Sequence, residues 1–294
     1  MDKIVHQKIT VATLRSLGLE PNNYQLLLDA SIEPDKSYEQ SIENIRILED
    51  EEVKDIENRY DSMHSDSLLD SIRIGLSKWG SIASTKLRSM GSQAFQYTSW
   101  AIEHGPNGKD NAAHYFRIAY TSHGNKRLIN LGHCLHYVAD TGTPYHRKRL
   151  EELYSIPSGT PKELRSYVYL ENLLNFAKSV IEDHKRFEME LSSFWNTRKG
   201  ESVCEKVLNS GFNSARTKRP FTSVSETITQ FEDALANVEK KATYYCKILD
   251  NRFAGRQLGE KLSREDRKFI LKAGLSCLVR IGEASYWASK AILL

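Results

Sequence analysis

Apolar side chains recur at intervals of three and four positions along the chain, whereas no stretch of any length alternates between apolar and polar residues. The first pattern is typical of amphipathic α-helices, and the second would be typical of β-strands. Near the C-terminal end, the clearest helical stripe consists of Ile270, Ala273, Cys277, Ile281, Ala284 and Ala288. This stripe predicts a helix over residues 264–292 that packs one face inward. The chain has only 16 glycines and 7 prolines in 294 residues, which also favours helix.

These patterns predict one all-α domain, a multi-helix bundle that spans residues 1–294. Further helices are expected over 6–18, where Gly18 is the C-terminal stop, and over 22–29, 38–62, 66–102, 112–121, 125–140, 225–250 and a long run that ends near 191. Loops are expected at 31–37, 103–111 and 155–161, where proline, glycine and asparagine gather, and a break at 141–144. The polar residues 195–222 are expected to be irregular.

Composition and charge exclude several classes of protein. The formal net charge of +3 is too small to argue for nucleic-acid binding. No run of eighteen apolar residues is present, so no transmembrane segment is expected. The opening MDKIVHQKIT lacks the apolar region of a signal peptide, which predicts a cytoplasmic protein as written, or a secreted one if a leader has been removed. The four cysteines lie far apart and are expected to be small buried hydrophobes.

Histidines are concentrated in one part of the chain. Six of the nine fall within the 43 residues from His104 to His146. There the stretch LGHCLHYVADTGTPYH, residues 131–146, combines an apolar helical stripe with ionisable groups. His136 and Asp140 are four positions apart, so on a helix both side chains lie on one face and can hold one cation. The Thr-Gly-Thr-Pro turn that follows can fold His146 back over the same place.

A second predicted helix repeats this arrangement. His184 and Glu188 continue an apolar stripe made of Leu170, Leu174, Ala177 and Ile181. A buried carboxylate without a partner is costly, so Glu188 needs a compensating group, of which a metal is one. Hydrogen-bonded core histidines and surface ion pairs are the alternative interpretation of both His/acid pairs. Nitrogen and carboxylate ligands without cysteine suit zinc, although the residues alone leave the identity of the metal open.

Three segments together resemble a known family. LGHCLHYVADTGTPYH is similar to the motif LGxxLHYLxDxxxPxH, HKRFE at 184–188 to HxxYE, and AAHYFRIAY at 112–120 to AxxYFxxA. These motifs are those of the zinc-dependent phospholipases C, which are related to the S1/P1 nucleases. The resemblance implies a single all-α domain of that type, with a helical insertion at about 38–98. It also implies two or three zinc ions and hydrolysis of a phosphodiester, such as a phospholipid head group.

In this resemblance two zinc ions share the carboxylate of Asp140. His136 and His104 would complete the ligands of the first ion. His104 matches a histidine in the family's upstream loop. Two metals close together lower the pKa of water, so that hydroxide forms at neutral pH and attacks the phosphorus in line. The reaction would then need no covalent nucleophile from the protein.

The resemblance also assigns the remaining ligands. The second ion would be held by His146, His184 and Glu188. The third would be held by Met1, His6 and Asp35, and Asp35 would also orient or deprotonate the attacking water. Met1 stands where the family has a tryptophan.

Several alternatives stay open. Aligning YVYLENLL, residues 167–174, with the motif HxxYENxV would make Glu171 the ligand and put Tyr167 in place of its histidine. An S1/P1-type nuclease or nucleotidase would take nucleic acid as substrate, whereas a phospholipase would make peripheral contact with a membrane. The missing tryptophan and leader would suit a non-catalytic helical protein that binds metal. His133 stands at an aliphatic position of the family and is expected not to bind metal.

Overall fold

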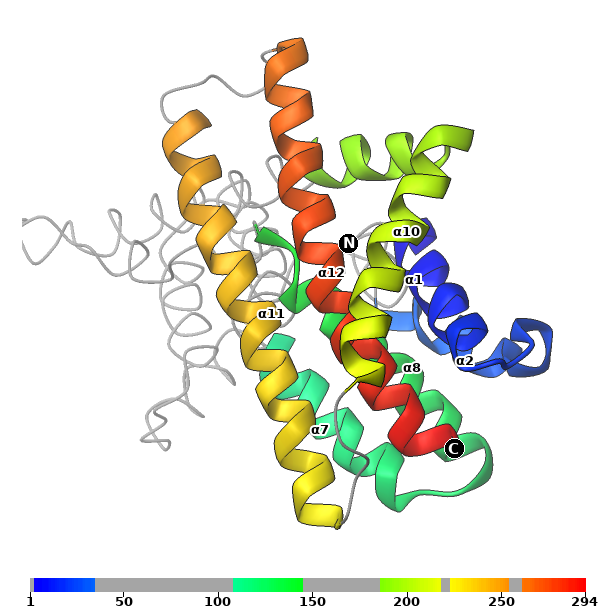
Figure 1. The fold of residues 1–294 in the computed structure, drawn as a ribbon. Helices are drawn as coiled ribbons and strands as arrows, with labels where there is room; N and C mark the ends of the chain where they lie inside the picture. The colour runs from blue at the N-terminus through cyan, green and yellow to red at the C-terminus, as the bar shows by residue number, and fades with distance from the viewer. Residues whose placement is uncertain (1–2, 35–107, 145–185, 218–222, 254–260) are drawn as a thin grey trace, which may run out of the picture. The chain divides into compact units, whose positions relative to one another are not determined.

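A computed structural model describes residues 3–34, 108–144, 186–217, 223–253 and 261–294 (Figure 1). Within these ranges every regular element is a helix and no strand occurs, which confirms the all-α prediction. The chain divides into two compact units, and all described residues belong to the unit formed by 1–36, 103–148 and 182–294. The helices expected at 38–62 and 66–102, the run before 186 and the insertion at 38–98 lie outside the described residues.

Eight helical elements are assigned among the described residues. They are α1 (Lys3–Ser16), η1 (Pro21–Tyr24), α2 (Gln25–Ala30), α7 (Gly108–Thr121), α8 (Gly124–Thr141), α10 (Arg198–Arg216), α11 (Val224–Phe253) and α12 (Arg264–Leu293). Residues 186–195 are helical as well. None of the helices in these ranges is long and apolar enough to cross a membrane.

Helix α12 is the centre around which the other helices pack. Figure 1 draws it with α11 on one side and α10 on the other, and it also contacts α1, α7 and α8. A capping box of Ser263 and Asp266 starts it, since each side chain accepts from the other's backbone N–H. All six residues of the predicted stripe are buried, but so is every residue from 281 to 289. The prediction of a single inward face therefore holds for the first half of the helix and is wrong for the second.

Helix α10 corrects the prediction that residues 195–222 are irregular. The hydroxyl of Thr197 accepts from the backbone N–H of Gly200 and so caps the helix at 2.9 Å. The buried face carries Cys204, Leu208, Phe212 and Ala215, which are spaced by four, four and three positions. Most other residues of the helix are charged or polar. Because they are so many, the short apolar stripe was not recognised in the sequence.

Other boundaries differ by a few residues. Helix α7 begins at Gly108, inside the predicted loop 103–111, and Gly108 itself lies close to Thr141 at the end of α8. Glu33 and Pro34 are helical although 31–37 was expected to be a loop, since proline is tolerated in a first helical turn. Gly18 has a φ of +74° directly after α1, and α8 ends at Thr141, so both predicted stops are confirmed.

The four cysteines are all free and buried, as the sequence predicts. Burial raises the pKa of the Cys204 and Cys277 thiols to about 12 and raises that of Cys134 further. These residues fill space in the core, and none of them belongs to the group of described residues that could hold a metal.

Glycine allows two pairs of helices to approach closely. A Cβ atom added to Gly211 of α10 would lie 2.1 Å from the carbonyl oxygen of Val279 and 2.8 Å from the backbone nitrogen of Glu283, both in α12. On Gly132 of α8, a Cβ would lie 2.7 Å from the carbonyl oxygen of Leu27 in α2. Both contacts are with backbone, which cannot rotate away as a side chain would. These glycines set the distances between the helices.

We expect Gly211→Ala to destabilise the protein by about 2 kcal/mol, because the added methyl group overpacks the α10–α12 contact. On an unconstrained helix the same substitution would stabilise by about 1 kcal/mol. Urea unfolding followed by circular dichroism measures the difference. Asn209→Ala, at an exposed position two residues earlier, is the control. Equal or greater stability of Gly211→Ala would contradict the described packing.

Candidate metal centre

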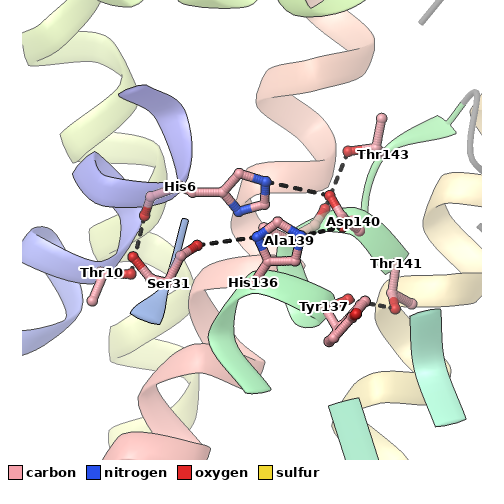
Figure 2. Close-up of polar contacts among 9 residues, drawn as sticks. All are labelled: His6, Thr10, Ser31, His136, Tyr137, Ala139, Asp140, Thr141 and Thr143. Carbon is pink, nitrogen blue, oxygen red and sulfur yellow. Dashed lines mark hydrogen bonds and ion pairs between the residues drawn. The ribbon is translucent and has the colours of Figure 1, made fainter. Parts of the chain in front are cut away.

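Helices α1 and α8 bring together three ionisable residues that are distant in the sequence. His6 lies on the buried face of α1, whereas His136 and Asp140 lie one turn apart in the buried C-terminal half of α8. The three side chains are at most 1% exposed. One ligand atom from each lies within 4.8 Å of the others, which makes them a group that could hold a metal ion. Figure 2 shows the group and its polar contacts.

Each oxygen of the Asp140 carboxylate faces a different imidazole. Oδ1 lies 3.3 Å from Nε2 of His6, and Oδ2 lies 2.9 Å from Nε2 of His136. The two imidazole rings are stacked, with their centroids 4.1 Å apart and their planes 14° from parallel. Both Nε2 atoms therefore approach one carboxylate from two helices, and the site exists only where α1 packs on α8.

The proton on His136 is placed by a backbone contact. Its Nδ1 lies 3.0 Å from the carbonyl oxygen of Ser31, which directly follows α2. A carbonyl oxygen can only accept, so Nδ1 must carry the hydrogen. In neutral His136 the Nε2 atom therefore holds a lone pair, directed at the Asp140 carboxylate. Histidines that bind a metal through one ring nitrogen usually donate the N–H of the other to a backbone carbonyl or a carboxylate, as Nδ1 of His136 does here.

A lone pair and a carboxylate 2.9 Å apart repel each other unless a cation lies between or beside them. The cation is either a proton, which makes His136 an imidazolium, or a metal ion. Two ligand atoms of a tetrahedral zinc ion are about 3.3 to 3.5 Å apart, given ordinary zinc–nitrogen and zinc–oxygen distances. The His6–Asp140 distance of 3.3 Å, to Oδ1, equals such an edge, and the His136–Asp140 distance of 2.9 Å, to the other oxygen Oδ2, is somewhat shorter. Two imidazole nitrogens and a carboxylate are donors of the types that zinc takes.

His6 is held in its neutral form. Burial, which is the largest cause, and the nearby His136 together lower its pKa to about 4, against the attraction of Asp140. A histidine binds metal only when it is deprotonated. At neutral pH the imidazole of His6 thus has a lone pair available for a cation.

The structure describes four of the nine predicted ligands. It brings His6, His136 and Asp140 together, and it does not place Glu188 in that group. Glu188 is half-buried within the helical residues 186–195, and its role as a ligand stays a prediction. The remaining five lie outside the described residues, as do the alternative positions 167 and 171: they are Met1, Asp35, His104, His146 and His184.

Two partners of the site were missed by the sequence analysis. The Ser31 carbonyl contacts His136, and the exposed carboxylate of Glu33 lies 2.9 Å from Nε2 of His133. His133 is thus directed at Glu33 and is not part of the metal-binding group. A backbone carbonyl leaves no signal in a sequence, and no spacing rule joins Glu33 to a residue one hundred positions later.

Comparison with known proteins adds no relative: no family model, no curated protein and no solved structure matches this chain. The resemblance to the zinc-dependent phospholipases C therefore rests on the quoted motifs. What the structure adds is that His6, which lies outside the three quoted motifs, is close to His136 and Asp140.

We expect the metal-free protein to lose stability as the pH falls from about 7 to 4. In this range the unfolded chain protonates His6 near its ordinary pKa of 6.5, whereas the folded chain keeps it neutral to about pH 4. The unfolded state then binds more protons, and acid favours it by up to about 3 kcal/mol. Urea titrations with a chelator present, at several pH values, measure this loss.

The variant His6→Gln should show a shallower pH dependence over the same range, because glutamine does not titrate. His114→Gln removes an exposed histidine and is the matched control. If His6→Gln and the unsubstituted protein lost stability in parallel, His6 would not be the buried neutral group described.

Proposed function

We propose that the protein is a zinc-dependent phosphodiester hydrolase of the phospholipase C type. The observation that carries this proposal is the meeting of His6, His136 and Asp140 in one buried group. Two of them come from the LGxxLHYLxDxxxPxH resemblance and the third from an early helix. Their convergence supports the assignment, because the family's chemistry requires these ligand types in one place.

The protein's own groups would perform distinct tasks. The carboxylate of Asp140 presents one oxygen to each imidazole, which suits a ligand shared between two ions. His136 is oriented by the Ser31 carbonyl, and His6 is kept neutral by burial. Bound zinc would supply Lewis acidity toward a phosphoryl oxygen and a hydroxide at neutral pH.

We expect the protein, purified without chelator, to contain two or three zinc ions per chain. Asp140→Asn should weaken zinc binding by about 100-fold or more, because the amide keeps the volume of the side chain and removes the charge that the ions share. Elemental analysis and competition with a chromogenic chelator measure both quantities. His114→Gln is the matched control. Fewer than two zinc ions per chain would contradict the proposal.

Hydrolysis separates the proposed activity from metal binding alone. A chromogenic phosphocholine ester should be cleaved by the zinc-loaded protein, and Asp140→Asn should lose at least about 1,000-fold of that rate, since a shared ligand affects both ions. Parallel assays use phosphatidylcholine vesicles and single-stranded DNA. Cleavage of DNA alone would assign the S1/P1-type activity instead, and zinc binding without any hydrolysis would indicate a non-catalytic metal-binding protein.

A further inference from the structure

The segment that follows α2 is attached to α8 at two points. The carbonyl oxygen of Ser31 accepts from Nδ1 of His136 at 3.0 Å, and a carboxylate oxygen of Glu33 lies 2.9 Å from Nε2 of His133. His133 and His136 are one helical turn apart on α8, so their side chains lie on the same side of the helix. Ser31 and Glu33, two residues apart, thus contact His136 and His133, which are three residues apart on α8.

Both attachments depend on close contact between the helices. Gly132 precedes His133 directly, and a Cβ there would lie 2.6 Å from the Cβ of Ala30 and 2.7 Å from the carbonyl oxygen of Leu27. Any larger residue would push α2 away from α8 at the level of His136. Ser31 itself is held by its own contacts, since its backbone nitrogen donates to Leu27 and its hydroxyl to Leu28.

The contact with Ser31 decides which ring nitrogen of His136 carries the proton. The carbonyls at the C-terminal end of a helix have no partner within the helix, and they lie at the negative end of its dipole. Such an oxygen is a good acceptor for Nδ1–H. If the segment moved away, the proton could move to Nε2 and donate to Asp140 directly. Nε2 would then have no lone pair for a metal.

We propose that His133 and Glu33 are positioning residues for the metal centre: their contact fastens Ser31 against His136 and so keeps the ring turned with Nδ1–H toward the Ser31 carbonyl and Nε2 toward the centre. The pair is at the surface, with His133 18% and Glu33 61% exposed, and it touches none of the three buried ligands. It acts only through the Ser31 carbonyl. This inference rests on the proposed function insofar as His136 is a metal ligand.

The test removes the pair without touching the buried group. Glu33→Gln and His133→Gln each remove one partner of the contact, and the double variant removes both. We expect each single variant to weaken zinc binding by about 10- to 100-fold, the usual effect of losing a partner that orients a ligand. The double variant should be no weaker than the worse single one, because both act through one contact. Competition with a chromogenic chelator gives the affinities.

A spectroscopic signal distinguishes positioning from general loosening. Long-range ¹H–¹⁵N spectra of the metal-free protein at about pH 8, where histidine is mostly neutral, report which ring nitrogen of His136 carries hydrogen. The unsubstituted protein should show hydrogen on Nδ1 of His136, and both single variants should show a fraction of the ring without it. Glu232→Gln is the matched control, since it breaks another exposed ion pair between helices, with Arg117.

Unchanged zinc affinity together with an unchanged His136 signal in Glu33→Gln would overturn the proposal. So would an equal loss of affinity in Glu232→Gln. The proposed function fails on different results: absence of hydrolysis, or of zinc from the unsubstituted protein. The position of the proton on His136 is measured without metal or substrate. This measurement therefore tests the role of the Glu33–His133 contact whether or not the proposed function holds.

Discussion

A carboxylate with no exposed surface needs hydrogen bonds or positive charge to compensate it, and α1, α2 and α8 meet around such a carboxylate, that of Asp140. Its two oxygens face His6 and His136, and each imidazole approaches with Nε2. His136 has its other nitrogen occupied by the Ser31 carbonyl, while His6 is kept neutral by burial. Neither histidine compensates the charge well unless a proton or a metal ion is added. The group is therefore better suited to binding a cation than to stabilising the fold without one.

The rest of the described helices hold these three in place. Helix α12 is enclosed over its second half and contacts α1, α8, α10 and α11. The end of α8 presses on it closely: a Cβ at Gly142 would lie 2.4 Å from the side chain of Ile281. Gly142 comes two residues after Asp140, so this close contact lies beside the metal-binding group.

Helical periodicity predicted much of this arrangement and left the rest open for identifiable reasons. The α8 face with His136 and Asp140 was readable because i and i+4 residues always lie together on a helix. The stop at Gly18 was readable because a left-handed residue favours glycine. Helix α10 was missed because its buried stripe has only a few residues among many polar ones.

Contacts between distant segments were harder to predict from the sequence. His6 was assigned through a family resemblance, and no pattern of spacing joins it to Asp140. The Ser31 carbonyl was missed because every residue has a carbonyl, and only tertiary structure selects one. The Glu33–His133 pair was missed because complementary charges occur throughout a chain with this many charged residues.

The position of His6 on the first helix has a consequence for how that helix is held. His6 is the contribution of α1 to the centre, and the other two ligands come from a helix more than one hundred residues later. A cation held by all three would join the ends of a very long loop, much as a crosslink does. Without it, α1 is retained by its apolar contacts and by polar contacts that Lys8 and Ser16 make with the segment 195–216. A bound cation would thus add a link between the first helix and α8 to the contacts that already hold it.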